Sequence, residues 1–315
     1  MSQNYDYTII GIDGGGTRTR GILRRRGKTI AKTNSGTTRI GAVGVGESSE
    51  RLLNVIADLC TQSDIDSAEL DAVVIGLAGV WLDEERKRSA QLIKTLARGR
   101  DIILNDLLVV SDAELALQGA LEGKPGIVMI VGTGSIAVGK ASGNKIIRCG
   151  GWGIELDDEG SGAWIGREGL TAVVRALDGR GNKTSLSKVL VEMNPYIDLS
   201  NPRTIVKAYS ERAFEYHMLT PLVMKAAEEG DEVCQEIIQR SAYHLMELLE
   251  ALKGDFKTKT INVAMMGGII DADTMLSRML VERINKHSTF KLIEAKGSAE
   301  DGAITMGIKL IDEMS

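Results

Sequence analysis

One short segment near the start of the chain combines a carboxylate, consecutive glycines and a hydroxyl: Asp13, Gly14, Gly15, Gly16 and Thr17. Glycines let a turn adopt positive φ, and they let backbone N–H groups approach a ligand without interference from a Cβ atom. The carboxylate and the hydroxyl stand directly beside them. The segment therefore predicts a turn that can hold phosphates, and a tight hairpin that binds nothing is the alternative.

The residues around this turn indicate which kind of phosphate loop it is. The apolar run Ile9–Ile12 precedes it, and Gly21, Ile22 and Leu23 resume a β-like composition after it. A Rossmann fingerprint or a Walker loop needs a helix directly after the turn, and the Walker loop also needs Gly-Lys-Ser/Thr. Neither condition holds, so the segment predicts a β-hairpin with a glycine tip.

A second candidate is an acid at the end of a predicted strand. The buried strand Leu107–Val110 leads into Ser111 and Asp112, and a helical pattern follows over Ala113–Leu121. Open α/β sheets bind their ligands at the carboxyl ends of strands. Asp112 is therefore a candidate catalytic carboxylate, and a plain helix N-cap is the alternative interpretation.

The opening pattern returns later in the chain. The segment Ile127–Gly139 is again an apolar strand, a polar glycine turn and a second strand. Its turn consists of Gly132, Thr133, Gly134 and Ser135. Two hairpins of this type predict a duplicated domain, with a phosphate-binding turn from each half.

Two further glycine-rich segments are candidates for ligand contact. Between Cys149 and Trp164, glycines flank Trp152 and the acids Asp157, Asp158 and Glu159 follow: the glycines are Gly150, Gly151 and Gly153. Acids at a helix start are explained by the helix dipole, but a tryptophan in a glycine loop is not. After the predicted strand Thr260–Met265, Gly267 and Gly268 would allow a flat ring such as adenine to lie against the backbone, and a simple tight turn is equally compatible.

Length and composition narrow the class of protein. A chain of 315 residues is longer than single cores usually grow, so two domains are expected. The net charge is -5, and the basic residues Arg24–Arg26 form only a short cluster. A sequence without a larger basic cluster argues against a nucleic-acid partner. The three cysteines are far apart, which argues against zinc and Fe–S sites and favours reduced thiols. We expect a cytoplasmic protein without a membrane segment.

The remaining segments are mostly helical. Residues 34–46 are rich in Gly and Thr and predict a loop, and leucines and isoleucines at helical spacing predict a helix over Glu47–Cys60. Helices are also predicted for Asp83–Ala97, for Ala272–Ile284 and for most of residues 182–253. A terminal helix is predicted over Ala299–Met314.

Taken in chain order, the motifs resemble one family: IDGGGT (12–17), GLAG (76–79), SDA (111–113), GTGS (132–135), GGWG (150–153), DEGS (158–161) and Gly267-Gly268. The ordered set resembles the BadF/BadG/BcrA/BcrD ATPase family over essentially the whole chain, and within it the N-acetylglucosamine kinase branch. The resemblance implies two ribonuclease-H-like α/β domains of the actin-like ATPase fold, with mixed five-stranded sheets flanked by helices and ATP in the interdomain cleft. The implied domains are residues 1–112 with 300–315, and residues 113–299.

The resemblance also implies roles for the candidate residues, with ATP and Mg²⁺ as cofactors, a small-molecule sugar as substrate and a homodimer as the assembly. Asp13 would orient hydrated Mg²⁺, and Asp112 would be the general base on the sugar hydroxyl. The phosphates and the adenosine would be held by the glycine turns: Gly14, Gly15, Gly16, Thr17, Gly132, Gly134, Ser135, Gly267 and Gly268. The sugar contacts would come from Thr133, Gly151, Trp152, Gly153 and Asp158.

One position departs from the family pattern. Sugar kinases of this kind carry an Asn in a Gly-x-x-Asn pattern after the third strand, and here Gly36-Thr37-Thr38-Arg39 places Arg39 there. Arginine recognises carboxylates bidentately, so the substrate is either a neutral sugar such as N-acetylglucosamine or an acid sugar such as 2-keto-3-deoxygluconate or N-acetylmuramate. In the first case Arg39 points to solvent.

Two other classes of function compete with the kinase. ATPase activators of 2-hydroxyacyl-CoA dehydratases share the fold, but they hold an Fe–S cluster with closely placed cysteines, which this chain lacks. A nucleotide-binding regulator without catalysis is the other alternative, and the strand-end acid Asp112 argues against it.

Overall fold

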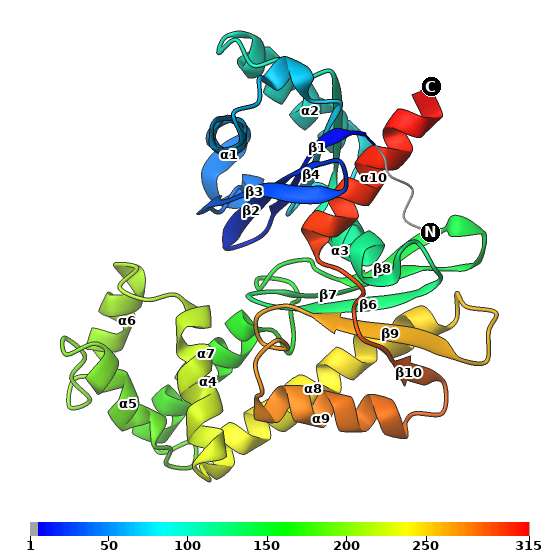
Figure 1. Cartoon of the computed structure of the whole chain (residues 1–315). Helices are drawn as coiled ribbons and strands as arrows, with labels where there is room; N and C mark the ends of the chain where they lie inside the picture. The colour runs from blue at the N-terminus through cyan, green and yellow to red at the C-terminus, as the bar shows by residue number, and fades with distance from the viewer. Residues whose placement is uncertain (1–5, 315) are drawn as a thin grey trace. The chain divides into compact units, whose positions relative to one another are not determined.

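The computed structural model describes residues 6–314, and the chain divides by its contacts into two compact units. The first unit runs from the start of the described chain to Val128 and takes in the segment from Glu294 onward. The second unit is Met129–Ile293. Each unit contains a five-stranded sheet with helices packed on it (Figure 1).

The sheet of the first unit has the order β3-β2-β1-β4-β5. Its strands are β1 (Thr8–Gly14), β2 (Arg18–Arg25), β3 (Lys28–Gly36), β4 (Ala72–Leu77) and β5 (Asp106–Ser111). Strands β1, β2 and β3 form an antiparallel meander, whereas β1, β4 and β5 run parallel. The predicted glycine-tipped hairpin is therefore β1-β2, and a strand rather than a helix follows its turn.

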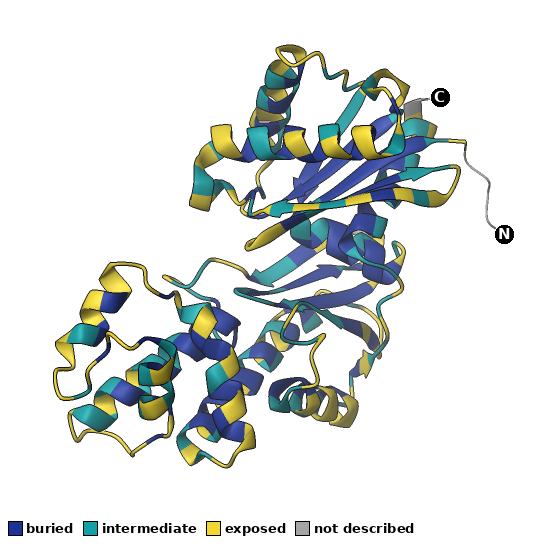
Figure 2. Ribbon diagram, turned by 60° about the vertical axis from the view of Figure 1, so that its left-hand side comes forward, coloured by how far each residue is buried: buried dark blue, intermediate teal, exposed yellow. Residues whose placement is uncertain are grey.

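Helices cover both faces of this sheet, and the strand sequence explains why. The helices are α1 (Ile40–Ser63), α2 (Asp83–Arg98), α3 (Asp112–Leu121) and α10 (Ala299–Met314). In β1, Ile10 and Ile12 join the core beneath α1 and α2, and Ile9 joins Ile304 of α10 on the other face. Since side chains alternate along a strand, a run that is apolar at every position must be buried on both faces. The central strands β1 and β4 are accordingly buried at nearly every position, whereas β3 at the sheet edge is mostly exposed or half-buried; Figure 2 shows dark blue strands beside strands with teal and yellow stretches.

The loop expected over residues 34–46 is wrong at both ends, and the segment between the two elements is only residues 37–39. Strand β3 continues to Gly36, and α1 begins at Ile40 with a break at Gly44, where φ is 79°. Buried side-chain bonds hold this first segment, because the Ser48 hydroxyl donates to the Thr38 carbonyl at 2.7 Å. Ile40 also packs against the core. Both contacts are tertiary, so the Gly- and Thr-rich composition gave no sign of the helix.

The second unit repeats the strand order of the first. Its sheet has the order β10-β9-β6-β7-β8, so β6 to β10 take the places that β1 to β5 take in the first sheet. The strands are β6 (Gly126–Val131), β7 (Ser135–Lys140), β8 (Ile146–Gly150), β9 (Ile261–Met266) and β10 (Phe290–Leu292). Strands β7 and β8 are antiparallel, and β9 and β10 are parallel. The duplication that the two glycine turns predict is therefore present in the sheet topology.

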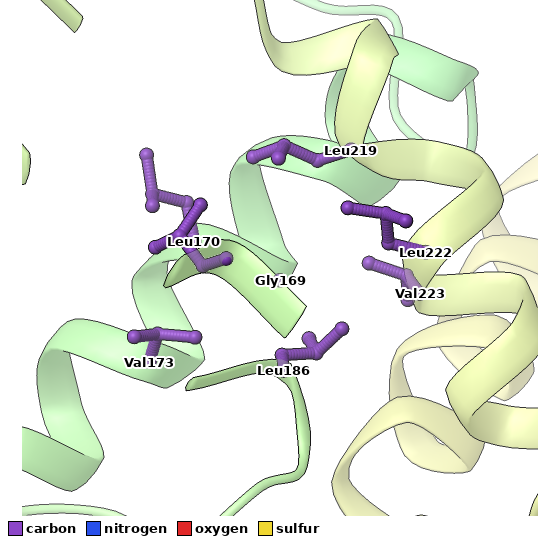
Figure 3. Close-up of a pocket in the computed structure, with 8 residues that line it drawn as sticks. Gly169, Leu170, Val173, Leu186, Leu219, Leu222 and Val223 are labelled. Atoms are coloured by element: carbon purple, nitrogen blue, oxygen red, sulfur yellow. The ribbon is translucent and has the colours of Figure 1, made fainter. Parts of the chain in front are cut away.

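The helices of the second unit are α4 (Gly162–Leu177), α5 (Leu186–Met193), α6 (Arg203–Ser210), α7 (Tyr216–Glu228), α8 (Glu232–Lys253) and α9 (Met275–Lys286). Helix α4 packs closely on α7, because a Cβ at Gly169 would come within 2.5 Å of Val223 Cγ2. The apolar space around this contact measures about 10 Å³ (Figure 3). That volume holds one water molecule at most, so the contact is a packed core.

The contact division falls later than the boundary that the resemblance implies. Helix α3 begins at Asp112 and packs against α10, and both belong to the first unit. This contact depends on glycine, since a Cβ at Gly119 would come within 1.9 Å of the Ser298 carbonyl oxygen. The chain therefore crosses to the second unit within β6.

The structure also shows the surroundings of the basic cluster and of the three cysteines, and the apolarity of the helices. The basic cluster at the end of β2 forms ion pairs. Arg24 binds Asp301, Arg25 binds Glu69 and Arg26 binds Asp6: the distances are 2.6, 3.1 and 2.6 Å. Free thiols are found at Cys60, Cys149 and Cys234. Over residues 6–314, none of the helices has the length and apolarity that crossing a bilayer requires.

Candidate functional site

The strands of the first unit bring Asp13 and Asp112 to the same edge of the sheet. Strands β1, β4 and β5 are parallel, and their register pairs Gly14 with Leu77 and Leu77 with Ser111. Between the two acids lies Gly76, where a Cβ would come within 3.1 Å of the Asp112 Cα. A side chain at this position of β4 would collide with Leu115 and crowd Asp112, so the glycine lets the start of α3 pack closely on β4.

The N-cap interpretation of Asp112 is wrong. Ser111 is the N-cap of α3, and its hydroxyl accepts the N–H of Glu114 at 3.2 Å. The Glu114 carboxylate accepts the Ser111 N–H in return, which completes a capping box. Asp112 is the first residue of the helix proper, and its Oδ1 accepts the N–H of the neighbouring Ala113 at 2.9 Å. Capping of α3 therefore does not explain why a carboxylate stands at position 112.

The negative charge around Asp13 is only partly compensated by nearby cations. Burial, together with the charges of Asp112 and Glu300, raises the pKa of Asp13 to about 7, against the lowering effect of Arg20 and Arg18. The nearest cation, the Arg20 guanidinium, is 3.9 Å from Asp13 Oδ2 and is partly exposed. A pair at this distance and exposure compensates a charge weakly. The site is therefore suited to a bound cation.

The pKa of Asp112 is also raised toward neutral pH. Burial raises its pKa to about 6, although hydrogen bonds from backbone N–H groups and the charge of Arg39 lower it. Arg39 is therefore one of the charges that act on the Asp112 carboxylate. The Arg39 side chain is exposed, and its backbone N–H donates to the Thr37 hydroxyl just before α1. A base with a pKa close to neutrality is matched to proton transfer at physiological pH.

Glu300 is a residue of this site that sequence reasoning missed. It lies in the first turn of α10, only 8% of it is exposed, and its charge acts on Asp13. In the sequence it reads as an ordinary acid at a helix N-terminus. Its proximity to Asp13 follows only from the packing of α10 against β1, so no local signal could have found it.

The first glycine turn is fixed by a threonine that the sequence did not single out. The Thr37 hydroxyl is within hydrogen-bond distance of the carbonyl oxygens of Gly15 and Gly16, at 3.1 and 2.9 Å. At Gly14 a Cβ would come within 2.5 Å of the buried Thr38 hydroxyl, whereas at Gly16 it would meet nothing within 4 Å. The turn is therefore packed at its base and open at its tip, as a phosphate-binding turn requires. Thr17 follows the tip and is exposed.

The second glycine turn rests on the start of α4. The N–H groups of Gly162 and Ala163 donate to the carbonyl oxygens of Gly132 and Thr133, both at 2.9 Å. These bonds use donors that a helix N-terminus otherwise leaves unpaired. The second glycine turn is therefore bound to the first residues of α4 by backbone hydrogen bonds.

Asp158 packs beneath this second turn. It is 7% exposed and has a left-handed backbone, with φ of 60°. Its Oδ1 accepts the Ser135 N–H at 3.3 Å, and a Cβ at Gly134 would come within 2.8 Å of its Oδ2. The sequence predicts Asp158 as a sugar contact, and the structure gives it a bracing role within the second unit.

Trp152 stands on an exposed loop of the second unit. Its side chain is 64% exposed, and the Arg148 guanidinium carbon lies 4.0 Å from the ring centre. The neighbouring Gly151 and Gly153 have φ of 76° and 92°, which explains the glycines. The Trp152 N–H donates to Asp157 Oδ2 at 3.1 Å, so the ring rather than this N–H is available to a ligand.

Gly267 and Gly268 follow β9 and differ from each other. Gly267 has φ of 109°, and a Cβ there would come within 2.4 Å of the Val131 carbonyl oxygen. Gly268 is exposed, and a Cβ there would meet nothing within 4 Å. Gly267 is thus required by the turn itself, and Gly268 leaves the open surface that a flat ring needs.

The described residues fit a nucleotide with Mg²⁺. Within residues 6–314, no cluster of three His, Cys, Asp or Glu side chains could hold a metal by itself. Mg²⁺ usually binds through one or two carboxylates and completes its shell with water and substrate phosphates. The undercompensated Asp13 beside an open glycine turn matches that donor set, and Asp13 would hold the cation.

Comparison with known proteins identifies the family. The family model described as the BadF/BadG/BcrA/BcrD ATPase family matches residues 10–307. The chain belongs to this family. An N-acetyl-D-glucosamine kinase from Dictyostelium discoideum is 30% identical over 295 residues, 88% of this chain and 89% of the relative. An N-acetylmuramic acid/N-acetylglucosamine kinase from Clostridium acetobutylicum is 28% identical over 303 residues, with 94% and 96% covered.

Solved structures confirm the predicted actin-like ATPase fold. A candidate N-acetylglucosamine kinase from Chromobacterium violaceum has a TM-score of 0.75 at 24% identity, and the match covers 96% of this chain and 99% of that one. A ROK family glucokinase from Streptomyces griseus has a TM-score of 0.60 at 15% identity, with 97% and 99% covered. At these identities the likeness concerns the fold.

Proposed function

We propose that the protein is an ATP-dependent kinase that transfers the γ-phosphoryl group to a hydroxyl of an amino sugar, with Asp112 as the general base. The observation that carries this proposal is that Asp112, a partly buried carboxylate with its pKa raised to about 6, lies at the same edge of the sheet as Asp13. The names of the relatives support it, since these proteins are named kinases of N-acetylglucosamine and N-acetylmuramic acid.

In the proposed reaction Asp112 accepts the proton of the attacking sugar hydroxyl. Phosphoryl transfer depends mainly on positioning and charge neutralisation, so one correctly placed base is sufficient protein chemistry. Such a base contributes about 10²–10⁴-fold to the rate. The Ala113 N–H bond at Oδ1 orients the carboxylate toward its task.

The other residues bind and shield. Mg²⁺, when bound, neutralises phosphate charge, and Asp13 orients it. The turns at Gly14–Thr17 and Gly132–Ser135 hold phosphate oxygens, and Gly267 and Gly268 border the adenosine. The sugar contacts are Thr133 and the Trp152 ring with its flanking glycines. Asp158 supports the turn at Ser135.

N-acetylglucosamine is the first candidate substrate, and a specific observation favours a second. Arg39 is exposed and close enough to Asp112 to lower its pKa, so a carboxylate on a sugar bound there would meet a guanidinium. N-acetylmuramate and 2-keto-3-deoxygluconate carry such a group. The relative from Clostridium acetobutylicum is named for both N-acetylmuramic acid and N-acetylglucosamine.

A coupled ADP-release assay with Mg²⁺-ATP tests the proposal and ranks the sugars. The panel is N-acetylglucosamine, glucosamine, glucose, N-acetylmuramate and 2-keto-3-deoxygluconate. We expect turnover on N-acetylglucosamine. The absence of turnover on every sugar, with ATP still bound, would move the function to the regulator or activator classes.

Arg39→Ala in the same assay separates the two substrate classes. If Arg39 recognises a carboxylate, the variant loses turnover on the acid sugars and keeps turnover on neutral ones. Arg88→Ala, an exposed arginine on α2, is the matched control. A neutral-sugar activity that Arg39→Ala leaves unchanged, with no activity on the acids, would refute the carboxylate role.

We also propose a cytoplasmic homodimer. The free thiols of Cys60, Cys149 and Cys234 suit a reducing compartment, and the dimer is what the family resemblance implies. The same three cysteines are too far apart in sequence for the cluster of a dehydratase activator. Light scattering at micromolar concentration checks the dimer.

A further inference from the structure

Glu300 has no structural task that accounts for its buried charge. Helix α10 is capped by its neighbours, because the Ser298 hydroxyl accepts the Asp301 N–H at 3.2 Å and Asp301 Oδ2 accepts the Ser298 N–H at 3.0 Å. Glu300 Oε2 is buried and accepts no hydrogen bond from any residue between 6 and 314. A buried polar oxygen left without a partner is costly, so it requires an explanation.

The packing of α10 brings Glu300 to the strand that carries Asp13. At Gly11 a Cβ would come within 2.9 Å of the Glu300 carbonyl oxygen and of the Ala303 Cβ. Gly11 and Asp13 are two residues apart on β1, so they share the face of the sheet that α10 covers. The charge of Glu300 acts on Asp13 accordingly.

We propose that Glu300 is a positioning residue for the divalent cation of the nucleotide, sharing with Asp13 the task of holding hydrated Mg²⁺ at the end of β1. This inference rests on the proposed function. The buried Oε2 accepts hydrogen bonds from the water around the cation, and the cation's charge offsets two carboxylates that otherwise repel each other. Outer-sphere partners of this kind change metal affinity by about 10–100-fold when they are removed.

The test measures how much Mn²⁺ tightens the binding of ADP. Calorimetry gives the ADP dissociation constant in Mn²⁺ and in EDTA for the full chain, and the ratio reports the cation that the protein holds. We expect Mn²⁺ to tighten ADP binding by the wild type, and we expect Glu300→Gln to lose about 10–100-fold of that gain. Binding in EDTA should be unchanged.

Two variants sharpen the result. Glu300→Asp keeps the charge on a shorter side chain and should retain part of the gain. Glu313→Gln removes an exposed charge from the end of the same helix and should retain all of it. Thermal melting in EDTA shows whether each variant folds, and neutralising a repelled carboxylate should not lower the melting temperature.

The outcomes separate this inference from the proposed function. A wild type that binds no ADP in either condition overturns both. A wild type whose ADP binding Mn²⁺ does not tighten, or a Glu300→Gln variant with the full gain, overturns the inference and leaves the kinase proposal standing. A Glu300→Gln variant that melts lower and keeps the full gain shows a structural role instead.

Discussion

The two glycine turns occupy equivalent places in two sheets of the same strand order, yet they are stabilised differently. The first turn lies beside Asp13, whose pKa is raised by two acids and is lowered less by Arg20, at 3.9 Å, and by Arg18. The second lies above Asp158, whose carboxylate is bound to the Ser135 N–H, and its carbonyl groups are bound to the start of α4. In the first unit the carboxylate beside the turn lacks a compensating charge, which suits it to bind a cation. In the second unit the carboxylate and the carbonyl groups are hydrogen-bonded within the unit, which suits that turn to a structural role.

The largest expected effect comes from removing the base of the first unit. Asp112→Asn should lower kcat by about 10²–10⁴-fold, because the amide cannot accept the hydroxyl proton. The binding of ADP, measured by calorimetry, should be retained. Asp106→Asn, at the opposite end of β5, is the control and should keep its activity. Turnover like that of the wild type in Asp112→Asn would remove this residue from the mechanism.

Alanine at matched glycines compares the two turns directly. In Gly134→Ala the new Cβ would stand 2.8 Å from Asp158 Oδ2, so the variant should lose about 1–3 kcal/mol of unfolding free energy. In Gly16→Ala the Cβ meets open space, and the change should stay within about 0.5 kcal/mol. Urea denaturation followed by circular dichroism measures both. Equal losses in the two variants would contradict the difference between the turns.

The pH dependence of catalysis should report the charge in the first unit. Asp112 must be ionised to act as a base, and its pKa is raised to about 6. As the pH falls through this value the base is protonated, so kcat/KM should fall about tenfold per pH unit below about 6. The residual activity of Asp112→Asn should lack this acid limb. An acid limb that persists in the variant would assign the titration to another group.

The sequence was informative where a signal is local. The apolar runs and the glycine turns predict both hairpins, and a strand followed directly by an acid and a helix predicts the place of Asp112. Repetition of the turn predicts the duplicated fold, which the sheet orders confirm. These features are each encoded within a few neighbouring residues.

The sequence was uninformative where tertiary packing decides. Glu300 comes to Asp13 only because α10 packs against β1, and Gly76 matters only because α3 approaches there. The start of α1 at Ile40 depends on the buried bond from Ser48 to Thr38. Contacts between segments far apart in the chain leave no periodic pattern, so single-sequence reasoning could not supply them.

The most direct test of the account is to identify the product of the reaction. Phosphorus NMR of the wild type with Mg²⁺-ATP and the best sugar of the panel should show ADP together with a phosphate monoester of the sugar, and Asp112→Asn should form that monoester at least about 100-fold more slowly. Release of inorganic phosphate without a sugar phosphate, or equal rates in the two proteins, would contradict the assignment of the first turn and Asp112 to phosphoryl transfer.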